Sequence, residues 1–175
     1  VSNVADLFLL DLSCSPMSGS ARLLKRLEDI VLSSLILILI SPLMVILALG
    51  VKLSSPGPVF YRQERVGLNG QPFMMLKFRS MRVEKGDCKG ARSTSREDDR
   101  VTRIGAIIRK TSIDELPQLI NVLKGDMSFV GPRALGVEEE SLLEELMPGF
   151  EMRLQIRPGL TGLAQIYDKT DDPYD

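Results

Sequence analysis

The residues best suited to chemistry are two adjacent carboxylates, Asp114 and Glu115. Ser112 and Glu115, three positions apart, form the S-x-x-E capping pattern, so residues 111–118 predict the start of a helix. Both acids would then lie in the first turn, where unpaired backbone N–H groups carry partial positive charge. Helix capping with dipole compensation is the simpler explanation of such a pair, and a catalytic role needs support from the rest of the chain.

Composition narrows the chemistry that is available. The chain of 175 residues contains no His and no Trp, and its formal net charge is −1. Because the chain has no His, three kinds of site are excluded: imidazole triads, His metal sites and His proton shuttles. Any acid–base or nucleophilic catalysis must therefore use carboxylates, Lys, Tyr, Ser or Cys. Cys14 and Cys88 lie in polar stretches and form no C-x-x-C pair, which indicates reduced thiols without a role.

Charge is distributed unevenly along the chain. Residues 52–110 carry 14 Lys and Arg against 6 Asp and Glu, whereas residues 111–175 carry 5 against 13. A basic block followed by an acidic one is typical of a protein that presents one part to an anionic surface or ligand. No recognised nucleic-acid motif accompanies the basic block, so we expect no nucleic-acid partner.

An apolar run at residues 30–51 predicts a membrane helix. At about 1.5 Å per residue, the run reaches roughly 33 Å, enough to cross a bilayer. It lacks the polar stripe that a soluble core helix needs, and it is too internal for a cleaved signal peptide. We therefore expect contact with membrane lipids.

Ser41 and Pro42 interrupt this run at its centre. Proline bends a helix, and each half alone would reach only about 16 Å, near half the hydrocarbon thickness. Lys and Arg flank both ends, whereas a spanning helix concentrates them on the cytoplasmic side. These features favour a re-entrant helix that returns to the same face, with a true span as the alternative.

The chain beyond the membrane segment predicts small elements of mixed type. Residues 59–67 and 73–81 are strand-like around a turn at 68–70, so we expect a β-hairpin. Lys77 and Arg79 would share one face of its second strand, which suits either solvent or a phosphate. Further expectations are a surface loop at 84–96, short helices at 106–110 and 116–123, an acidic solvated helix at 138–147, and strand-like segments within 126–133 and 157–165.

Two further cations are placed by the expected elements. The helix at 106–110 would end on basic residues and bring Arg109 to within five residues of Asp114 in sequence. A cation beside a helix N-terminus favours an anion site. A tight turn at residues 131–132 would present Arg133.

Seven short motifs resemble those of the monotopic phosphoglycosyl transferases, the bacterial sugar transferase family. They are SSPGPVFY at 54–61, RQERVG at 62–67, KFRSM at 77–81, DRVTRIG at 99–105, TSIDELPQ at 111–118, SFVGPR at 128–133 and RPGLTGLAQ at 157–165. The resemblance covers residues 25–166. Each motif alone is weak, but seven of them in one order are specific.

The resemblance implies an enzyme on the cytoplasmic face of the bacterial inner membrane. It would move a sugar 1-phosphate from a UDP-sugar to polyprenyl (undecaprenyl) phosphate and release UMP, initiating synthesis of a membrane glycoconjugate. Asp114 falls on the family's nucleophile, which forms an acyl phosphate, and Glu115 joins Asp114 as a ligand of Mg²⁺. The family's phosphate-binding cations fall on Lys77, Arg79, Arg109 and Arg133, and its helix break falls on Ser41 and Pro42.

This chemistry is coherent on general grounds. A carboxylate nucleophile divides one displacement between two poorly miscible substrates into two steps. Phosphoryl transfer needs positive charge from Mg²⁺, Arg or Lys, and Mg²⁺ typically uses one or two carboxylates together with phosphate oxygens. The family usually continues beyond the Ala-Gln motif, and larger members carry further helices and a domain in front, so the chain departs from the family in these two respects. Whether the natural chain continues past Asp175 is left open.

The predicted fold is mixed α/β and mainly helical, without a large sheet. It consists of a tail at 1–20, a re-entrant membrane helix region at 21–53, and a compact cytosolic catalytic domain of amphipathic helices and one hairpin at 54–175. Two rival functions remain: a non-catalytic membrane-surface module that binds anionic lipid or nucleotide, and a single-span protein with a cytosolic binding domain. The sugar, the pathway and any homo-oligomer are left open.

Overall fold

The computed structural model describes residues 19–82 and 100–162. Within these ranges the protein is a mixture of helices and two small sheets. The mixed, mainly helical fold class is therefore confirmed. Residues 1–18 of the expected tail at 1–20, the expected loop at 84–96, both cysteines and the end of the segment at 157–165 lie outside the described residues. Residues 19 and 20 of that tail belong to the first helix.

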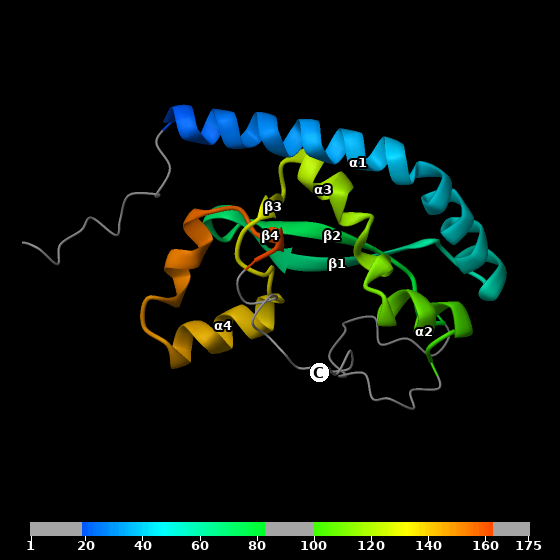
Figure 1. Ribbon diagram of the computed structural model, residues 1–175. Helices are drawn as coiled ribbons and strands as arrows, with labels where there is room; N and C mark the ends of the chain where they lie inside the picture. Colours follow the sequence, from blue (N-terminus) through cyan, green and yellow to red (C-terminus); the bar gives the residue numbers. More distant parts are fainter. Residues whose placement is uncertain (1–18, 83–99, 163–175) are drawn as a thin grey trace, which may run out of the picture.

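One long helix, α1 (Gly19–Ser54), runs along one side of the protein (Figure 1). By length and composition it is the one described helix that could cross a membrane. Pro42 lies inside it, and Figure 1 shows that α1 bends near its middle. Ser41 Oγ donates to the carbonyl of Ile38 at 2.8 Å, one turn before the proline. The helix is thus continuous but bent, as proline in a helix interior predicts.

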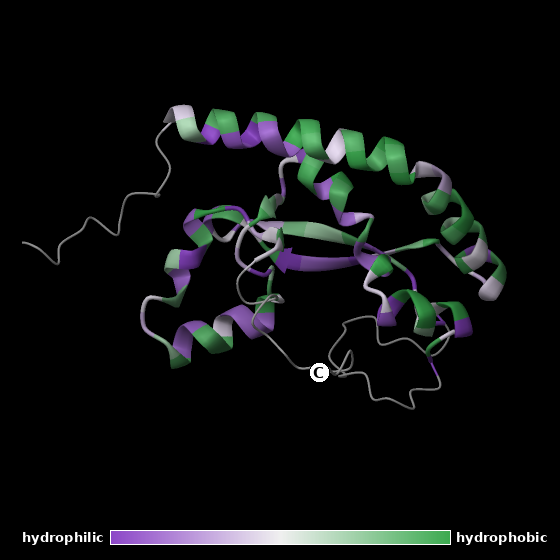
Figure 2. Cartoon of the chain, viewed as in Figure 1, coloured by the Kyte–Doolittle hydropathy of each residue, from purple (hydrophilic) through white to green (hydrophobic). Residues whose placement is uncertain are grey.

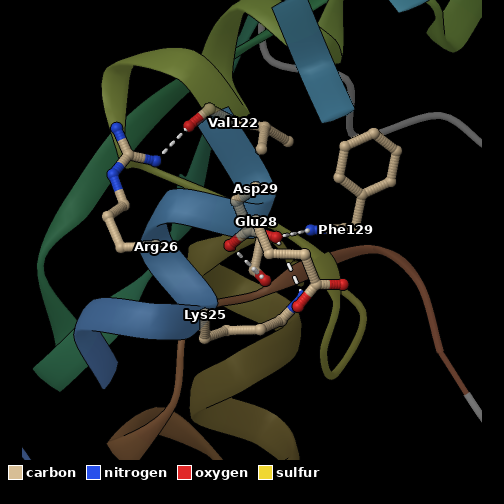
Figure 3. A network of polar contacts seen from close by, with 7 residues as sticks. Lys25, Arg26, Glu28, Asp29, Val122 and Phe129 are labelled. Carbon is tan, nitrogen blue, oxygen red and sulfur yellow. Dashed lines mark hydrogen bonds and ion pairs between the residues drawn. The ribbon is translucent and has the colours of Figure 1, made fainter. Parts of the chain in front are cut away.

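The first turns of α1 are fixed to the rest of the chain by a polar cluster (Figure 3). Asp29 is 2% exposed. It accepts hydrogen bonds from Lys25 Nζ at 2.9 Å, Ser128 Oγ at 2.8 Å and the Phe129 N–H at 3.2 Å. Arg26, on the same helix, donates to the carbonyls of Val122 and Leu123, at the end of a helix that is described below. A buried carboxylate with three donors is well satisfied, so this cluster anchors α1.

A β-hairpin lies beneath α1 and confirms the predicted one. Strands β1 (Phe60–Val66) and β2 (Pro72–Phe78) pair antiparallel, with Tyr61 opposite Lys77 and Arg65 opposite Phe73. The turn between them is a short 3₁₀ segment, η1 (Leu68–Gly70). Since opposite residues of an antiparallel pair share a face, Tyr61, Arg65 and Lys77 lie on one face.

Helix α2 (Arg103–Lys110) begins three residues earlier than the sequence predicted. Its N-cap is Thr102, whose Oγ1 accepts from the Gly105 N–H at 2.9 Å. A side chain at Gly105 would collide with the Ser80 backbone, so the helix start packs directly on the chain leaving β2. The DRVTRIG motif therefore has a structural role in docking α2.

Helix α3 (Gln118–Lys124) stops at Gly125, as predicted; Gly125 has a φ of 96°. Arg26 donates to the last carbonyls of α3, on Val122 and Leu123. Asn121 joins α3 to β2, because its Oδ1 accepts from the Leu76 N–H at 3.0 Å and its Nδ2 donates to the Met74 carbonyl at 2.8 Å. Helix α3 is thus held between α1 and the hairpin.

A second sheet joins two motifs that are distant in sequence. Strand β3 (Ser128–Val130) pairs in parallel with β4 (Gly159–Thr161). Gly131 and Gly159 touch through their backbones, and a Cβ on either would overlap main-chain atoms of the other segment. The sequence predicted strand-like segments here but not their pairing.

The acidic helix and the turn after it complete the described fold. Helix α4 (Val137–Leu146) is followed by the 3₁₀ segment η4 (Phe150–Gln155). The expectation that this helix is only a solvated face is wrong at Glu140, which is buried and pairs with Arg153 of η4 at 3.3 Å. Burial raises the pKa of Glu140, while the Arg153 charge opposes that rise.

Two apolar clusters hold these elements together. One joins β2 to α3 and the β3 region through Met75, Val122, Met127 and Ala134. The other joins α1 to β2 and α2 through Val51, Phe78 and Ile108. Helix α1 is therefore part of the same packed body as the hairpin.

Candidate active site

Asp114 and Glu115 lie in a 3₁₀ turn, η3 (Ile113–Glu115), between α2 and α3. The predicted capping role of Ser112 is wrong. Ser112 is left-handed, with a φ of 54°, and makes no side-chain cap; its N–H donates to the Arg109 carbonyl at 3.0 Å. Ser112 therefore closes α2 in the manner of a left-handed C-terminal residue instead of opening the next helix.

The side chain of Asp114 is withdrawn from water, with the residue only 8% exposed. Burial is the main cause that raises the pKa of its carboxyl above the usual range. Lys77 and Arg109 act in the opposite direction, and the neighbouring Glu115 adds to the rise. A buried carboxylate is poorly solvated, and one held between cations in this way is suited to nucleophilic attack.

Glu115 is paired with a cation from the hairpin. Lys77 Nζ lies 2.7 Å from Glu115 Oε1. Both side chains are partly exposed, at 24% and 38%, so the pair is accessible to a ligand. Lys77 lies on the same face of β2 as Met75, whose side chain packs against Val122 of α3. This packing brings Lys77 to η3, which directly precedes α3. The hairpin therefore delivers a positive charge to the two adjacent acids.

Arg109 lies in the last turn of α2, and its charge acts on the carboxyl of Asp114. The neighbouring Ile108 is buried against Val51 and Phe78, which orients this helix on the hairpin. The structure thus brings together four of the predicted residues: Asp114, Glu115, Lys77 and Arg109.

Arg133 follows the glycine-containing crossing of β3 and β4 and is exposed. Arg153 donates to its carbonyl group, and the Gly159 N–H donates to the preceding Pro132 carbonyl at 2.9 Å. The loop is therefore held by its backbone while the Arg133 side chain is left to face outward.

Arg79 lies in surroundings different from those predicted. Its guanidinium is buried and donates to the carbonyls of Pro56 at 2.9 Å and Ser55 at 2.6 Å, and to Ser55 Oγ at 3.0 Å. Those oxygens lie just after the end of α1, where unpaired carbonyls need donors. We therefore leave Arg79 out of the proposed phosphate-binding set and assign it to anchoring the end of α1.

The sequence missed Arg65, a half-buried cation on the same hairpin face as Lys77. Burial lowers the pKa of Arg65, and the nearby Arg133 charge lowers it further, whereas Glu139, Tyr61 and Glu115 act against this shift. Arg65 therefore lies near both Glu115 and Arg133. The sequence does show that Arg65 and Tyr61 lie an even number of positions apart and so share a face of their strand. That this face is also the face of Lys77 can be recognised only once the register of the hairpin is known.

The donor set near η3 fits a magnesium ion shared with phosphate. Among residues 19–82 and 100–162, no three His, Cys, Asp or Glu side chains gather as a metal cluster. Mg²⁺ needs no such cluster, since one or two carboxylates suffice when phosphate oxygens and water supply the remaining ligands. Asp114 and Glu115 offer these two carboxylates.

The outer surface of α1 is apolar along most of its length (Figure 2). Large exposed apolar side chains extend from Leu23 to Leu53. Ile107, 65% exposed on α2, adds to this surface near the end of α1, where Gly50 approaches Ile104. An exposed apolar surface of this extent marks an interaction with a membrane or a partner. Helix α2 lies between the end of α1 and η3 along this side of the site.

The profile of the bacterial sugar transferase family matches residues 20–174. Because this match covers nearly the whole chain, the chain belongs to the bacterial sugar transferase family, and the resemblance drawn from its motifs is confirmed.

Named relatives agree with this family. The chain is 53% identical over 152 residues to UDP-glucose:undecaprenyl-phosphate glucose-1-phosphate transferase of Escherichia coli (strain K12), covering 87% of this chain and 32% of that protein. It is 49% identical over 142 residues to the protein of the same name in Caulobacter vibrioides, covering 81% and 53%. It is also 49% identical over 146 residues to an exopolysaccharide production protein of Rhizobium leguminosarum bv. phaseoli, covering 82% and 73%. The chain thus spans about a third to a half of the first two proteins.

Proposed function

We propose that this chain is the phosphoglycosyl transferase unit of a membrane enzyme that transfers a sugar 1-phosphate from a UDP-sugar to undecaprenyl phosphate. UDP-glucose is the donor to test first, because two relatives are named for it. The observation that carries the proposal is the buried Asp114 next to Glu115, which pairs with Lys77, with the charges of Lys77 and Arg109 both acting on the Asp114 carboxyl. A binding module has no need of a buried acid in that setting.

In the proposed first step, a carboxylate oxygen of Asp114 attacks the phosphorus that carries the sugar. A bond forms between that oxygen and phosphorus, and the bond to the bridging oxygen of the diphosphate breaks. UMP leaves with the electron pair, and the phospho-sugar stays on Asp114 as an acyl phosphate. In the second step, the phosphate oxygen of the polyprenyl acceptor attacks the same phosphorus, and the Asp114 carboxylate is released.

The cations stabilise charge that develops on the phosphates. Lys77 and Arg109 lie beside the nucleophile, where preorganised donors lower the barrier of phosphoryl transfer. Arg133 extends this charge along the loop after β3. A bound Mg²⁺, held by Glu115 and Asp114, would neutralise phosphate oxygens.

The membrane helix brings these groups to the lipid phosphate. We propose that α1 is re-entrant, with its bend at Ser41 and Pro42 inside the bilayer and both ends on the cytoplasmic face of the inner membrane. The apolar surface of α1 and the exposed Ile107 support this placement, because they would set α2 and η3 at the depth of the headgroups.

The experiment that tests this function is release of UMP by the detergent-solubilised chain with undecaprenyl phosphate and Mg²⁺. UDP-glucose, UDP-galactose and two UDP-N-acetylhexosamines are compared, with and without EDTA. We expect release with one sugar, its loss on chelation and its recovery with added Mg²⁺. Nucleotide binding without UMP release from any of the four would contradict the transferase and favour the binding module.

A further inference from the structure

Arg65 is a partly buried cation of the hairpin that has no role in the reaction described above. It lies on β1, opposite Phe73, and shares its face of the hairpin with Lys77, which contacts Glu115. Arg62, three residues earlier on β1, lies opposite Leu76 on the other face and is exposed. The two arginines of one strand thus face different surroundings.

The contacts of Arg65 hold its guanidinium in place but leave it incompletely bonded. Its Nη2 donates to Gln63 Oε1 at 2.9 Å, and its Nη1 lies 3.5 Å from the Ala134 carbonyl and from Glu139 Oε2. The buried Nε has no hydrogen-bond partner within the part of the chain that the structure describes. A guanidinium has five donors, so Arg65 retains capacity for an anion.

The ion pair between Arg65 and Glu139 is weak. The Arg65 side chain is 18% exposed, whereas its partner Glu139 is 54% exposed and sits at the start of α4. A long contact to an exposed carboxylate contributes little and is easily exchanged for another anion. Arg133 precedes Ala134, whose carbonyl lies 3.5 Å from Arg65, and the charge of Arg133 acts on Arg65. Two like charges that repel each other favour the binding of an anion.

The position of Arg65 along the hairpin indicates which phosphate it meets. Strand β1 begins at Phe60, six residues after α1 ends, and Arg65 lies five residues further along. At about 3.3 Å per residue, it is roughly 17 Å from the start of the strand. Arg109 and Ile107, in contrast, lie on α2, which packs against the second half of α1. Arg65 is therefore at the end of the hairpin remote from the C-terminal end of α1 and from α2.

We propose that Arg65, together with Arg133, binds the diphosphate of the water-soluble nucleotide-sugar donor. This inference rests on the proposed function and assigns the donor to the Arg65 end of the hairpin and the lipid phosphate to the α2 end. On binding, the donor's phosphate oxygens replace Glu139 as the partner of Arg65. A bidentate guanidinium–phosphate contact is a strong, geometrically specific interaction.

Equilibrium binding of UDP to the full 175-residue chain in detergent tests the assignment without requiring turnover. We expect Arg65→Met to weaken UDP binding at least about tenfold, as loss of a charged hydrogen-bonding partner does. Arg62→Met, on the opposite face of the same strand, is the matched control and should bind UDP as the wild type does. Arg65→Lys keeps the charge but loses the bidentate geometry, so an intermediate affinity is expected.

Kinetics separate the two phosphates. Arg65→Met should raise the KM for the UDP-sugar at least about tenfold and leave the KM for undecaprenyl phosphate within about twofold. A rise in the acceptor KM alone would overturn the donor assignment, and UDP binding unchanged in both Arg65 variants, or absent from the wild type, would overturn the proposal. Absence of turnover in a wild type that binds UDP through Arg65 would contradict the proposed function and leave this inference standing.

Discussion

The pKa of the Asp114 carboxyl is determined by its burial and by a few charged residues. Burial raises the pKa of its carboxyl, and the charges of Lys77 and Arg109 limit that rise. In the proposed reaction Asp114 must be ionised when it attacks, so the two cations favour the reactive form as well as the phosphates. Removal of one cation should then change both the rate and its dependence on pH.

Lys77→Met tests this double role. Without the Lys77 charge, the pKa of Asp114 rises further, so a larger fraction of Asp114 is protonated at a given pH. We expect the acid limb of the first step, measured as UMP release, to move to higher pH. The rate above that limb should fall roughly a hundredfold, as for loss of one preorganised donor. Lys124→Met, at the far end of α3, is the control, and a limb that stays in place or moves to lower pH would contradict the account.

The same few residues show what sequence alone can and cannot provide. Asp114, Glu115, Lys77 and Arg109 were selected by motif and type, and the fold brings them together. The role of Ser112 was misjudged because a serine three residues before a glutamate also fits a left-handed end of the preceding helix. The partners of Arg79 depend on where α1 ends in space, and no spacing in the sequence contains that information.

Two elements, α1 and α3, are coupled more closely than the apolar run implied. The predicted run began after Lys25 and Asp29, so the face they form with Ser33, at intervals of four residues, was overlooked. In the structure this face turns toward β3 and α3 and carries the buried Asp29. Helix α1 therefore combines an apolar surface long enough to cross a membrane with a support for the helix that follows η3.

Asp29→Ala tests the support that α1 gives to the fold. The substitution leaves the Ser128 hydroxyl and the Phe129 N–H without their acceptor, and it leaves Lys25 with only its 3.5 Å contact to Glu28. We expect the free energy of unfolding in detergent to fall by about 2–3 kcal/mol. Glu28→Ala removes an adjacent, exposed carboxylate and should change it by less than about 0.5 kcal/mol. A loss of less than about 0.5 kcal/mol in Asp29→Ala would show that Asp29 does not stabilise the fold.

Pairing between distant elements is the part of the fold that the sequence left undetermined. The hairpin and the end of α3 at Gly125 were predicted because turn chemistry and helix stops are local. The β3–β4 pair joins segments 31 residues apart, and its requirement for glycine at 131 and 159 appears only when the two backbones meet. The motifs around Arg133 and Arg157 thus include residues that serve backbone contact.

At the scale of the whole molecule, the proposed reaction depends on how the chain meets the bilayer. A re-entrant α1 keeps both of its ends on one side, whereas a straight span would separate them. The bend in α1 and the packing of its second half on α2 favour the first arrangement. The sequence provides a direct test, because Cys14 precedes α1 and Cys88 follows it.

The two single-cysteine chains, Cys14→Ser and Cys88→Ser, should react alike with a membrane-impermeant maleimide. In sealed vesicles of one orientation, a re-entrant helix places both thiols on the same side, so both are labelled or both are protected. Labelling after addition of detergent establishes that each thiol is reactive. Protection of one thiol and labelling of the other in the same vesicles would establish a spanning helix instead.

The covalent step is the central claim, and intact-mass measurement tests it most directly. The solubilised chain is incubated with UDP-glucose and Mg²⁺ in the absence of a lipid acceptor, in parallel with Asp114→Asn. We predict that the wild type gains the mass of one phospho-glucose, that undecaprenyl phosphate removes it, and that Asp114→Asn gains nothing. The same gain of mass in Asp114→Asn, or UMP formed by a wild type that never gains mass before the acceptor is added, would contradict a nucleophilic Asp114.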